Sequence, residues 1–480
     1  MICLFYLIMR VAVISAEAVP YSKTGGLGDV AGALPKALKQ IGVDAFLITP
    51  FYRQTKENLI DHVALDDLWL TWRGRGFKAT VFYSEASGAP TFLIHAPEYF
   101  FRDSIYGYRE DYERFAFFNH AALVLIKRLG SAPDIVHLND WHCGFAAVEI
   151  AHLRFWDSYW ATPRTVFSVH NMAYQGVFGT EELWKLGFSS EFERNAFLSN
   201  GAASAMKAGL AVSDMLSTVS RRYSDEIQSA QEGYGLDWLT RSRANRLVGI
   251  TNGVDYEVWS PELDTEIAAN FSAHDLSGKV ECKKALLEQF SLPQDLERPI
   301  FASVTRLTAQ KGIDLMMQVA GEILATGAYI ISLGSGEKQY EDFWQKLRDY
   351  APRQVGVYRG YNESLAHKIE AGADMFLMPS KFEPCGLNQM YSLKYGTIPI
   401  VHAVGGLDDT VHNFDAVSGK GNGFKFKRFQ SDRFLERIYE SLFAYYDKDA
   451  WRKLQWNGMT EDNSWENAAR KYVQLYNMTI

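Results

Sequence analysis

The chain of 480 residues has a formal net charge of -8 at pH 7, with 47% hydrophobic and 22% charged residues. This length exceeds what one hydrophobic core usually supports, so two or three domains are expected, and the composition is that of an ordinary globular protein. The acidic balance argues against nucleic acid or an anionic membrane as the main partner.

The first nine residues, Met1–Met9, are apolar but lack the basic start and the small-residue cleavage site of a secretory signal. We interpret them as a short extension, and the sequence leaves open whether Met1 or Met9 is the start. The four cysteines are widely spaced, without a CxxC pair or a His-rich cluster. They indicate neither a disulfide framework nor a zinc site, and the cytoplasm is the expected compartment.

The first predicted strand, residues 10–15, leads into the glycine-rich loop Lys23-Thr-Gly-Gly-Leu-Gly-Asp29 and then into a helix predicted over residues 30–40. Such a loop can offer backbone N–H groups to a diphosphate. Its glycines do not fit G-x-G-x-x-G, the second strand at residues 44–49 does not end in an acidic residue, and G-K-[ST] is missing. The pattern disfavours a nicotinamide dehydrogenase and a P-loop protein, and leaves a ligand loop and a tight turn both open.

Short apolar runs then alternate with helical patterns, at residues 92–95, 135–138, 165–169, 215–219 and 247–250. The alternation predicts a parallel sheet covered by helices, with ligands bound beyond the carboxyl ends of its strands. Polar clusters follow two of these strands, His137-Leu-Asn-Asp140-Trp-His142 and His170-Asn171. Each cluster is either a set of structural hydrogen bonds or part of a site.

The turn Asn252-Gly-Val-Asp255 precedes a polar, less regular passage to residue 294, which is the predicted hinge. A second series of strands is predicted at residues 300–304, 329–333, 355–358, 375–378 and 397–402. The fold class is therefore α/β, with two Rossmann-like domains, residues 1–255 and 256–460, facing each other across a deep cleft.

Two segments of the second half carry candidate ligand groups. Arg306 and Lys311 follow the first strand there, and such cations can hold a diphosphate, Arg by its bidentate fork and Lys as a point charge. Glu383 opens the segment EPCGLNQMYSLKYGT, where a carboxylate and Pro384 precede a predicted helix whose N-terminus could face an anion. Alone, the first pair also fits a solvated loop and the second segment an ordinary helix cap.

Taken together, these segments resemble the bacterial glycogen/starch synthase family over nearly the whole chain. The resemblance implies the GT-B fold, with a C-terminal helix in residues 461–480 that crosses back to the first domain. It also implies a retaining glucosyltransferase that moves glucose from a nucleotide-glucose to the non-reducing end of an α-1,4-glucan. The matching segments are KTGGLGD (23–29), NDWH (139–142), VHNMAYQG (169–176), NGVD (252–255), SVTRLTAQKG (303–312), GYNE (360–363), KFEPCGLNQMYSLKYGT (381–397) and GGLDDTV (405–411).

The same resemblance implies roles for individual residues. Arg306 and Lys311 would hold the donor diphosphate, and Tyr361 would stack on the nucleobase. Asn388 stands where relatives often carry Thr, which leaves its own contact open. The residues expected to be catalytic are Asp140, His170, Arg306, Lys311 and Glu383, and those expected to bind substrate are Glu17, Lys23, Gly25, Gly26, Asp29, Asn171, Asn252, Tyr361, Cys385, Gly386, Leu387 and Asn388.

These residue types fit glucosyl transfer. Cations at the diphosphate stabilise the departing negative charge, and a carboxylate at the sugar stabilises an oxocarbenium-like centre. Because none of the carboxylates stands out as a double-displacement nucleophile, departure and acceptor attack are expected on the same face of the sugar. We expect no metal and no other cofactor, since Arg306 and Lys311 neutralise the diphosphate, and the letters Asp447-Lys-Asp449 fit a solvated turn.

The expected partners are ADP-glucose or UDP-glucose and glycogen or α-1,4-glucan oligosaccharides, with neither nucleic acid nor membrane. The alternatives are a non-catalytic glucan-binding or regulatory protein on the same fold, a GT-B glucosyltransferase with a small acceptor, and a glucan phosphorylase, for which the sequence shows no pyridoxal phosphate lysine context. The aromatic run Tyr99-Phe-Phe101 and Tyr106 either stack on glucan rings or belong to the core.

Overall fold

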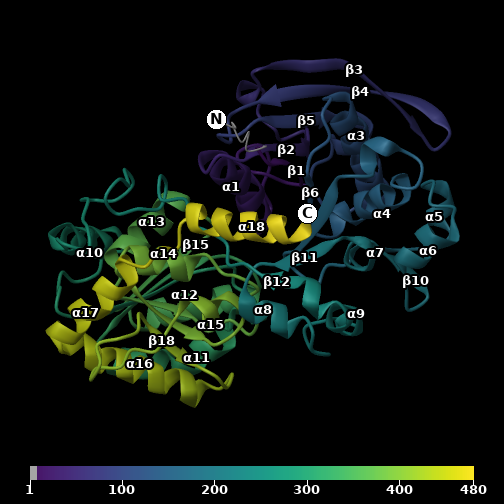
Figure 1. The fold of residues 1–480 in the computed structure, drawn as a ribbon. Helices are drawn as coiled ribbons and strands as arrows, with labels where there is room; N and C mark the ends of the chain where they lie inside the picture. The colour runs from purple at the N-terminus through teal and green to yellow at the C-terminus, as the bar shows by residue number, and fades with distance from the viewer. Residues whose placement is uncertain (1–7) are drawn as a thin grey trace, which may run out of the picture. The chain divides into compact units, whose positions relative to one another are not determined.

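The computed structural model describes residues 8–480 and divides into two compact units. The N-terminal unit comprises the chain up to Gly253 together with Trp465–Ile480, and the C-terminal unit comprises Val254–Ser464 (Figure 1). The extension predicted at Met1–Met9 falls almost wholly outside the described residues. Among residues 8–480, no helix is both long enough and apolar enough to cross a membrane.

The N-terminal unit is built on a nine-stranded sheet of order β12-β11-β7-β6-β1-β2-β5-β4-β3. The strands from β12 to β5 pair in parallel, as the alternation predicted, because helices connect them. The strands are β1 (Arg10–Ile14), β2 (Asp44–Pro50), β3 (His62–Trp72), β4 (Arg75–Ser84), β5 (Thr91–His95), β6 (Ile135–Asn139), β7 (Arg164–Val169), β11 (Met215–Thr218) and β12 (Leu247–Gly249).

The sequence analysis missed the long antiparallel hairpin β3–β4 at one edge of this sheet. Its two strands meet at Arg73 and Gly74, which have φ angles of 52° and 72°. A two-residue turn with positive φ at both positions matches the twist of paired strands. The described residues also contain a small antiparallel sheet of β8 (Val177–Phe178), β10 (Ala202–Ser204) and β9 (Leu198–Ser199).

The helix after the glycine-rich loop, α1 (Gly26–Gln40), begins four residues earlier than predicted, with Gly25 as its N-cap. Gly26 and Gly28 therefore lie in its first turn. The other helices of the unit are α2 (Pro97–Phe100), α3 (Asp111–Arg128), α4 (Gly144–Leu153), α5 (Glu182–Lys185), α6 (Glu191–Phe197), α7 (Ala205–Val212), α8 (Arg221–Glu226), α9 (Asp237–Ser242) and α18 (Trp465–Thr479).

The C-terminal helix α18 belongs to the core of the N-terminal unit, as the resemblance implied, and it packs on α1 (Figure 1). The hydroxyl of Tyr476 lies 2.8 Å from Nδ1 of His137 on β6. Gly253 lies against the start of this helix, where a Cβ would come within 2.4 Å of the Trp465 Cα. The glycine of the NGVD segment is therefore required by the close approach of α18.

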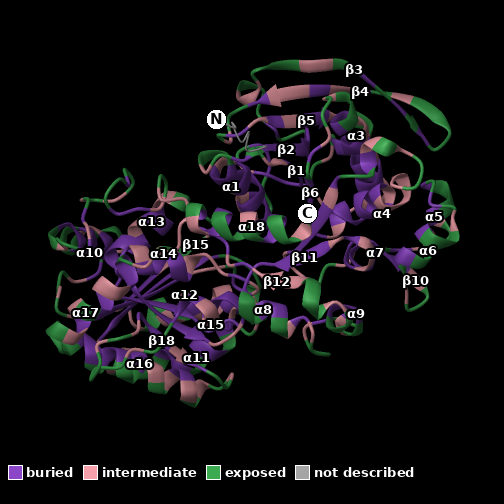
Figure 2. Ribbon diagram, viewed as in Figure 1, coloured by how far each residue is buried: buried purple, intermediate pink, exposed green. Residues whose placement is uncertain are grey.

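The C-terminal unit has a six-stranded parallel sheet of order β15-β14-β13-β16-β17-β18. Figure 2 shows its strands as buried and its outer helices as exposed along one side. The strands are β13 (Ile300–Val304), β14 (Tyr329–Gly334), β15 (Val355–Arg359), β16 (Met375–Met378), β17 (Ile398–His402) and β18 (Phe424–Phe426). The helices are α10 (Ser277–Gln289), α11 (Ile313–Ala325), α12 (Lys338–Tyr350), α13 (Glu363–Gly372), α14 (Asn388–Lys394), α15 (Gly405–Thr410), α16 (Ser431–Tyr446) and α17 (Lys448–Met459).

The irregular passage predicted from Trp259 to about residue 294 is wrong for its second half, where residues Ser277–Gln289 form α10. Lysines hide the helical pattern there, because Lys279 and Lys283 are buried and their amines are satisfied inside the unit. Lys283 pairs with Asp374 at 2.8 Å.

Both sheets reverse their strand order beside their first strand. In the N-terminal unit the chain adds β2 on one side of β1 and β6 on the other, and in the C-terminal unit β14 and β16 flank β13. Ligands of open parallel sheets bind at such a reversal, beyond the carboxyl ends of the two strands. The loops after β1 and β6, and those after β13 and β16, are therefore the places to look for a site.

Candidate functional site

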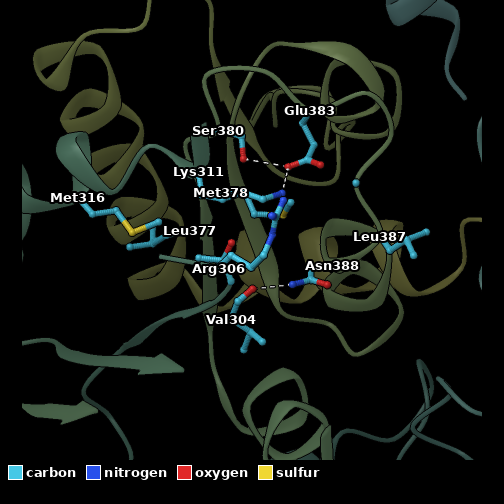
Figure 3. Close-up of a pocket in the computed structure, with 12 residues that line it drawn as sticks. Val304, Arg306, Lys311, Met316, Leu377, Met378, Ser380, Glu383, Leu387 and Asn388 are labelled. Carbon is cyan, nitrogen blue, oxygen red and sulfur yellow. Dashed lines mark hydrogen bonds and ion pairs between the residues drawn. The ribbon is translucent and has the colours of Figure 1, made fainter. Parts of the chain in front are cut away.

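A pocket of about 210 Å³ in the C-terminal unit lies at the carboxyl ends of β13 and β16. Figure 3 shows Arg306 and Lys311 extending toward Glu383 in this pocket. The structure thus brings together two segments that are far apart in the sequence. The lining residues are Val304, Thr305, Arg306, Lys311, Met316, Leu377, Met378, Ser380, Glu383, Gly386, Leu387 and Asn388.

An ion pair between Lys311 and Glu383 lies inside this pocket. The Lys311 Nζ donates to Oε2 of Glu383, and the Ser380 hydroxyl donates to the same oxygen at 3.1 Å. The two charged side chains are only 17% and 10% exposed, so the pair is largely shielded from water. With Arg306, the pocket holds two cations against one carboxylate, and this excess of positive charge favours an anionic ligand.

Ser380 was missed by the sequence analysis. It follows β16 by two residues, so the rule that ligand groups lie beyond strand ends would have found it. Its hydroxyl orients the Glu383 carboxylate.

The helix predicted to start near Pro384 begins instead at Asn388, so Glu383 lies on a turn before it. Gly386 has a φ of 71°, and a Cβ there would come within 2.5 Å of the Gln389 side chain. The start of α15 holds the same turn, since a Cβ on Gly405 would lie 1.9 Å from the Glu383 carbonyl oxygen. The glycines of both segments therefore serve the close packing of this turn.

The other predicted site residues of this unit differ in whether they lie at the pocket. The Asn388 amide donates to the Val304 carbonyl at 2.7 Å, so the contact that the sequence left open ties α14 to the end of β13. Cys385 is buried beside Gly386 and Leu387. Tyr361, on the loop after β15, is 72% exposed and does not line the described pocket.

Asp140, directly after β6, has an unusual backbone conformation with φ 62° and ψ 179°. A non-glycine residue held in a sparsely populated region costs on the order of 1–3 kcal/mol and is most often found at functional sites. Its side chain is buried, and Oδ1 has no hydrogen-bond partner among the residues that the structure describes. Burial raises the Asp140 pKa to about 8, and the Glu17 charge adds a smaller increase. The backbone N–H groups of His170 and Asn171 act in the opposite direction and lower this pKa.

Glu17, after β1, is a second buried carboxyl of the N-terminal unit. Its Oε2 accepts the Thr24 backbone N–H, and burial raises its pKa to about 7. Lys23 pairs with Asp29 at 2.7 Å.

Gly25 and Gly26 differ from most glycines of the chain, because a Cβ at either would meet nothing within 4 Å. Packing within the described chain therefore does not require glycine there. The open space beside their backbone is available to a ligand.

In the two polar clusters, His137 and His142 are buried and His170 is partly buried, and all three are uncharged at neutral pH. Burial lowers the pKa of His170 to about 4, and its Nε2 lies 2.9 Å from Oδ1 of Asn139. His137 contacts Tyr476 and Ser168 and has a pKa lowered to about 3, so it is one of the structural hydrogen bonders. Burial also lowers the pKa of His142.

Two further predicted residues of this unit are amides. Asn171 accepts the Ala173 backbone N–H at 3.0 Å. Asn252 is buried, and within residues 8–480 its Oδ1 has no hydrogen-bond partner.

The aromatic residues at 99–101 and 106 were expected either to stack on glucan rings or to belong to the core, and they differ in their surroundings. Tyr99 stacks on Phe117 at 4.2 Å and Phe100 is fully buried, so both belong to the core. Tyr106 instead stacks on His142 at 4.7 Å, and its buried hydroxyl has no hydrogen-bond partner in the described part of the chain. A tyrosine hydroxyl of this kind beside Asp140 is a candidate site residue for which the sequence offered only the aromatic run as a signal.

The D-x-D letters and the other possible metal ligands can be located in the part of the chain that the structure describes. Three or more His, Cys, Asp or Glu side chains never gather there in a way that could hold a metal ion. Asp447 of the D-x-D letters caps α17 by accepting the Ala450 N–H at 3.1 Å, as expected for a turn.

Comparison with known proteins gives consistent matches over both units. A family model described as the starch synthase catalytic domain matches residues 10–242, and one described as glycosyl transferases group 1 matches residues 286–447. The chain is 42% identical to a glycogen synthase of Koribacter versatilis over 98% of both chains. It is 41% identical to a glycogen synthase of Bacillus cereus over 98% of this chain and 99% of the relative.

Solved structures give the same picture. The catalytic domain of starch synthase IV from Arabidopsis thaliana, bound to ADP and acarbose, aligns with a TM-score of 0.89 at 31% identity over 98% of this chain and 99% of that chain. Sucrose-phosphate synthase from Thermosynechococcus elongatus aligns with a TM-score of 0.61 at 16% identity over 98% of both chains, a likeness of fold alone.

Proposed function

Because this chain belongs to the glycogen/starch synthase family, has its GT-B fold and is a glucosyltransferase, we propose that it transfers glucose from ADP-glucose to the non-reducing end of an α-1,4-glucan. The observation that carries the proposal is the convergence of Arg306, Lys311 and Glu383 in one pocket. We favour ADP-glucose over UDP-glucose because the starch synthase IV structure is described with ADP.

The cationic pocket is proposed to hold the donor diphosphate. A diphosphate offers more negative charge than the Glu383 carboxylate, so it would compete for Lys311 and also engage Arg306. As the bond between C1 and the phosphate oxygen breaks, negative charge grows on the leaving group. Two fixed cations stabilise that charge more than they stabilise the bound donor, which is how they would lower the barrier.

When Lys311 leaves Glu383 and binds the diphosphate, the Glu383 carboxylate would become available to the sugar. In the structure its Oε2 accepts hydrogen bonds from Lys311 and Ser380. Once Lys311 turns to the diphosphate, the carboxylate is free to orient the glucose hydroxyls or to stabilise the positive charge that develops at the anomeric carbon.

The buried groups of the N-terminal unit are proposed to bind the glucose itself. At neutral pH Asp140 keeps its proton and His170 is neutral, as their raised and lowered pKa values require. Uncharged donors and acceptors suit a neutral, hydroxyl-rich ring, and Oδ1 of both Asp140 and Asn252 accepts no hydrogen bond from the described residues. Gly25 and Gly26 leave room for the donor along their backbone.

We propose that the reaction retains the anomeric configuration. The acceptor hydroxyl attacks C1 from the face that the diphosphate leaves, and its proton passes to the departing phosphate oxygen. The C1–phosphate bond breaks, the new glycosidic bond forms, and ADP is released, so the step needs neither a metal nor another cofactor.

One assay tests the proposal. Nucleoside diphosphate release is measured from ADP-glucose and UDP-glucose, each with and without glycogen and with and without EDTA. We expect glycogen-dependent release from ADP-glucose that EDTA does not change, and an α-configured product by NMR. Binding of glycogen without release from either donor would instead indicate a non-catalytic glucan-binding protein.

A further inference from the structure

His402 is the last residue of β17, which pairs in parallel with β16. The carboxyl ends of parallel strands meet at one edge of a sheet, so His402 lies at the same edge as Ser380 and Glu383. Its side chain is buried, at 6% exposure, and it is not one of the residues that line the described pocket. Any part that His402 takes in the reaction is therefore taken through a neighbour.

The His402 ring is held in one orientation by a hydrogen bond and by aromatic neighbours. Its Nδ1 lies 2.9 Å from the backbone carbonyl oxygen of Ser380. A carbonyl oxygen only accepts, so Nδ1 carries the proton and donates it. The rings of Phe426 and Phe429 lie 5.2 Å and 5.3 Å from the imidazole. Packing and the hydrogen bond together direct this N–H at the segment that follows β16.

Ser380 links His402 to the charged pair of the pocket. Its carbonyl accepts from His402, and its hydroxyl donates to Oε2 of Glu383 at 3.1 Å (Figure 3). Ser380 is 1% exposed, so water does not readily replace a lost donor at its carbonyl. A buried carbonyl without a donor is costly and favours a rotated backbone, which would carry the hydroxyl away from Glu383.

The backbone of Glu383 is held separately from its side chain. The Gly406 N–H, at the start of α15, donates to the Glu383 carbonyl at 3.2 Å. Loss of the His402 hydrogen bond should therefore leave the turn in place and loosen only the carboxylate.

We propose that His402 is a positioning residue for glucosyl transfer, which orients the Glu383 carboxylate through Ser380. The role of Glu383 at the sugar rests on the proposed function. A catalytic group acts efficiently only when supporting side chains hold it close to its productive geometry. His402 supplies this support to Glu383, whereas Arg306 and Lys311 keep the diphosphate without it.

The test uses the different positions of the two ring nitrogens. The side-chain amide of Asn lies close to the place of Nδ1, and that of Gln close to the place of Nε2. His402→Asn should keep the donation to Ser380 and most of kcat. His402→Gln and His402→Phe should lower kcat roughly 10-fold, since a misplacement of about 1 Å at a reacting group can cost on the order of 100-fold. The KM for ADP-glucose should stay unchanged, because the cations are intact.

Thermal denaturation separates positioning from a purely structural role, with His402→Gln as the matched control for His402→Asn. Both variants lose the imidazole beside Phe426 and Phe429, so both should lose stability, but only His402→Asn should keep its kcat. A fall in kcat that follows the fall in Tm across the three variants would overturn the proposal. A normal kcat in His402→Phe would overturn it as well.

Ser380→Ala tests whether the effect passes through the serine hydroxyl. In a chain that already carries Ser380→Ala, His402→Phe should lower kcat little further, because residues that act in one network are not additive. Fully additive losses would show that His402 does not act through Ser380.

Crystal structures of the wild type, His402→Asn and His402→Phe test the geometry without turnover. The 3.1 Å contact between Ser380 Oγ and Glu383 Oε2 should be kept in the first two and lost in His402→Phe. An unchanged contact in His402→Phe would overturn the positioning role. Loss of the contact in that variant would support the role even if the wild type releases no ADP, an outcome that rejects only the proposed function.

Discussion

The two units hold their candidate site residues in opposite electrostatic states. In the C-terminal unit, Lys311 and Glu383 are charged and paired, with Arg306 exposed beside them. In the N-terminal unit, Asp140 is buried and His170 is partly buried, and both are uncharged at neutral pH. The sheets that carry them are alike, so the difference comes from the loops: in the C-terminal unit they place Lys311 beside Glu383, whereas in the N-terminal unit burial raises the pKa of Asp140 and lowers that of His170.

This difference in charge indicates that two similar sheets can bind chemically different parts of one substrate. A charged, partly open pocket binds an anion with little loss, because its cations are already solvated or paired. A buried set of neutral groups binds hydroxyls without the cost of desolvating an ion. The expected effects of substitutions therefore differ between the two units.

Removal of a cation from the C-terminal pocket should have the largest effect. Lys311→Ala and Arg306→Ala should each slow transfer by roughly 100-fold or more, about 3 kcal/mol, since each stabilises the leaving diphosphate. Steady-state ADP release measures this. Lys338→Ala, an exposed lysine on α12 of the same unit, is the control, and near-normal rates in the first two variants would remove them from the diphosphate site.

Asp140→Asn should lower the rate of transfer yet stabilise the folded N-terminal unit. The buried carboxyl must take up a proton on folding at pH 7, which an isosteric amide avoids, so we expect a gain of about 2 kcal/mol in the free energy of unfolding. Thermal denaturation measures the gain, at about 2–4 °C per kcal/mol for a domain of this size.

The stabilisation by Asp140→Asn should depend on pH with a definite sign. The Asp140 pKa is about 8 when folded and 3.8 in its ordinary state, so below pH 3.8 the carboxyl is protonated in both states and costs nothing. Between these values the cost of protonation in the wild type grows as the pH rises. The difference in stability should therefore increase from pH 4 to pH 8, and a constant difference would contradict the buried, protonated state.

Glu383→Gln should have the opposite sign of effect on stability. It leaves Lys311 shielded from water without its carboxylate, so we expect a loss of about 1–2 kcal/mol, less than for a fully buried pair. Ser380→Ala is the matched control, because it removes one hydrogen bond to the same oxygen and keeps the ion pair. If Glu383→Gln stabilised the chain as Asp140→Asn does, the contrast between the two units would be lost.

The smallest effect is expected at Tyr476→Phe, which removes the hydroxyl beside His137 and no other atom. Both groups are buried, so the loss of one hydrogen bond should cost about 1 kcal/mol and leave the rate of transfer unchanged. Thermal denaturation and ADP release test the two parts. A large fall in the rate would show that α18 does more than complete the core of the N-terminal unit.

The sequence was sufficient for much of the architecture. Apolar strands alternating with helices predicted the parallel sheets, because a strand buried on both faces must be apolar along its length. The sequence did not predict the elements whose local pattern was ambiguous. The hairpin β3–β4 lies at an edge and is partly exposed, and the lysines in α10 conceal a helix whose amines are satisfied only in the folded unit.

By itself, the sequence determined which residue types stand after which strands, and so which residues were candidates for the site. Only the tertiary structure decided their states. The Lys311–Glu383 pair joins residues 72 positions apart, and the pKa of Asp140 depends on burial that many segments create together. Ion pairing and desolvation are properties of the whole packed unit, so they cannot be derived from the local sequence alone.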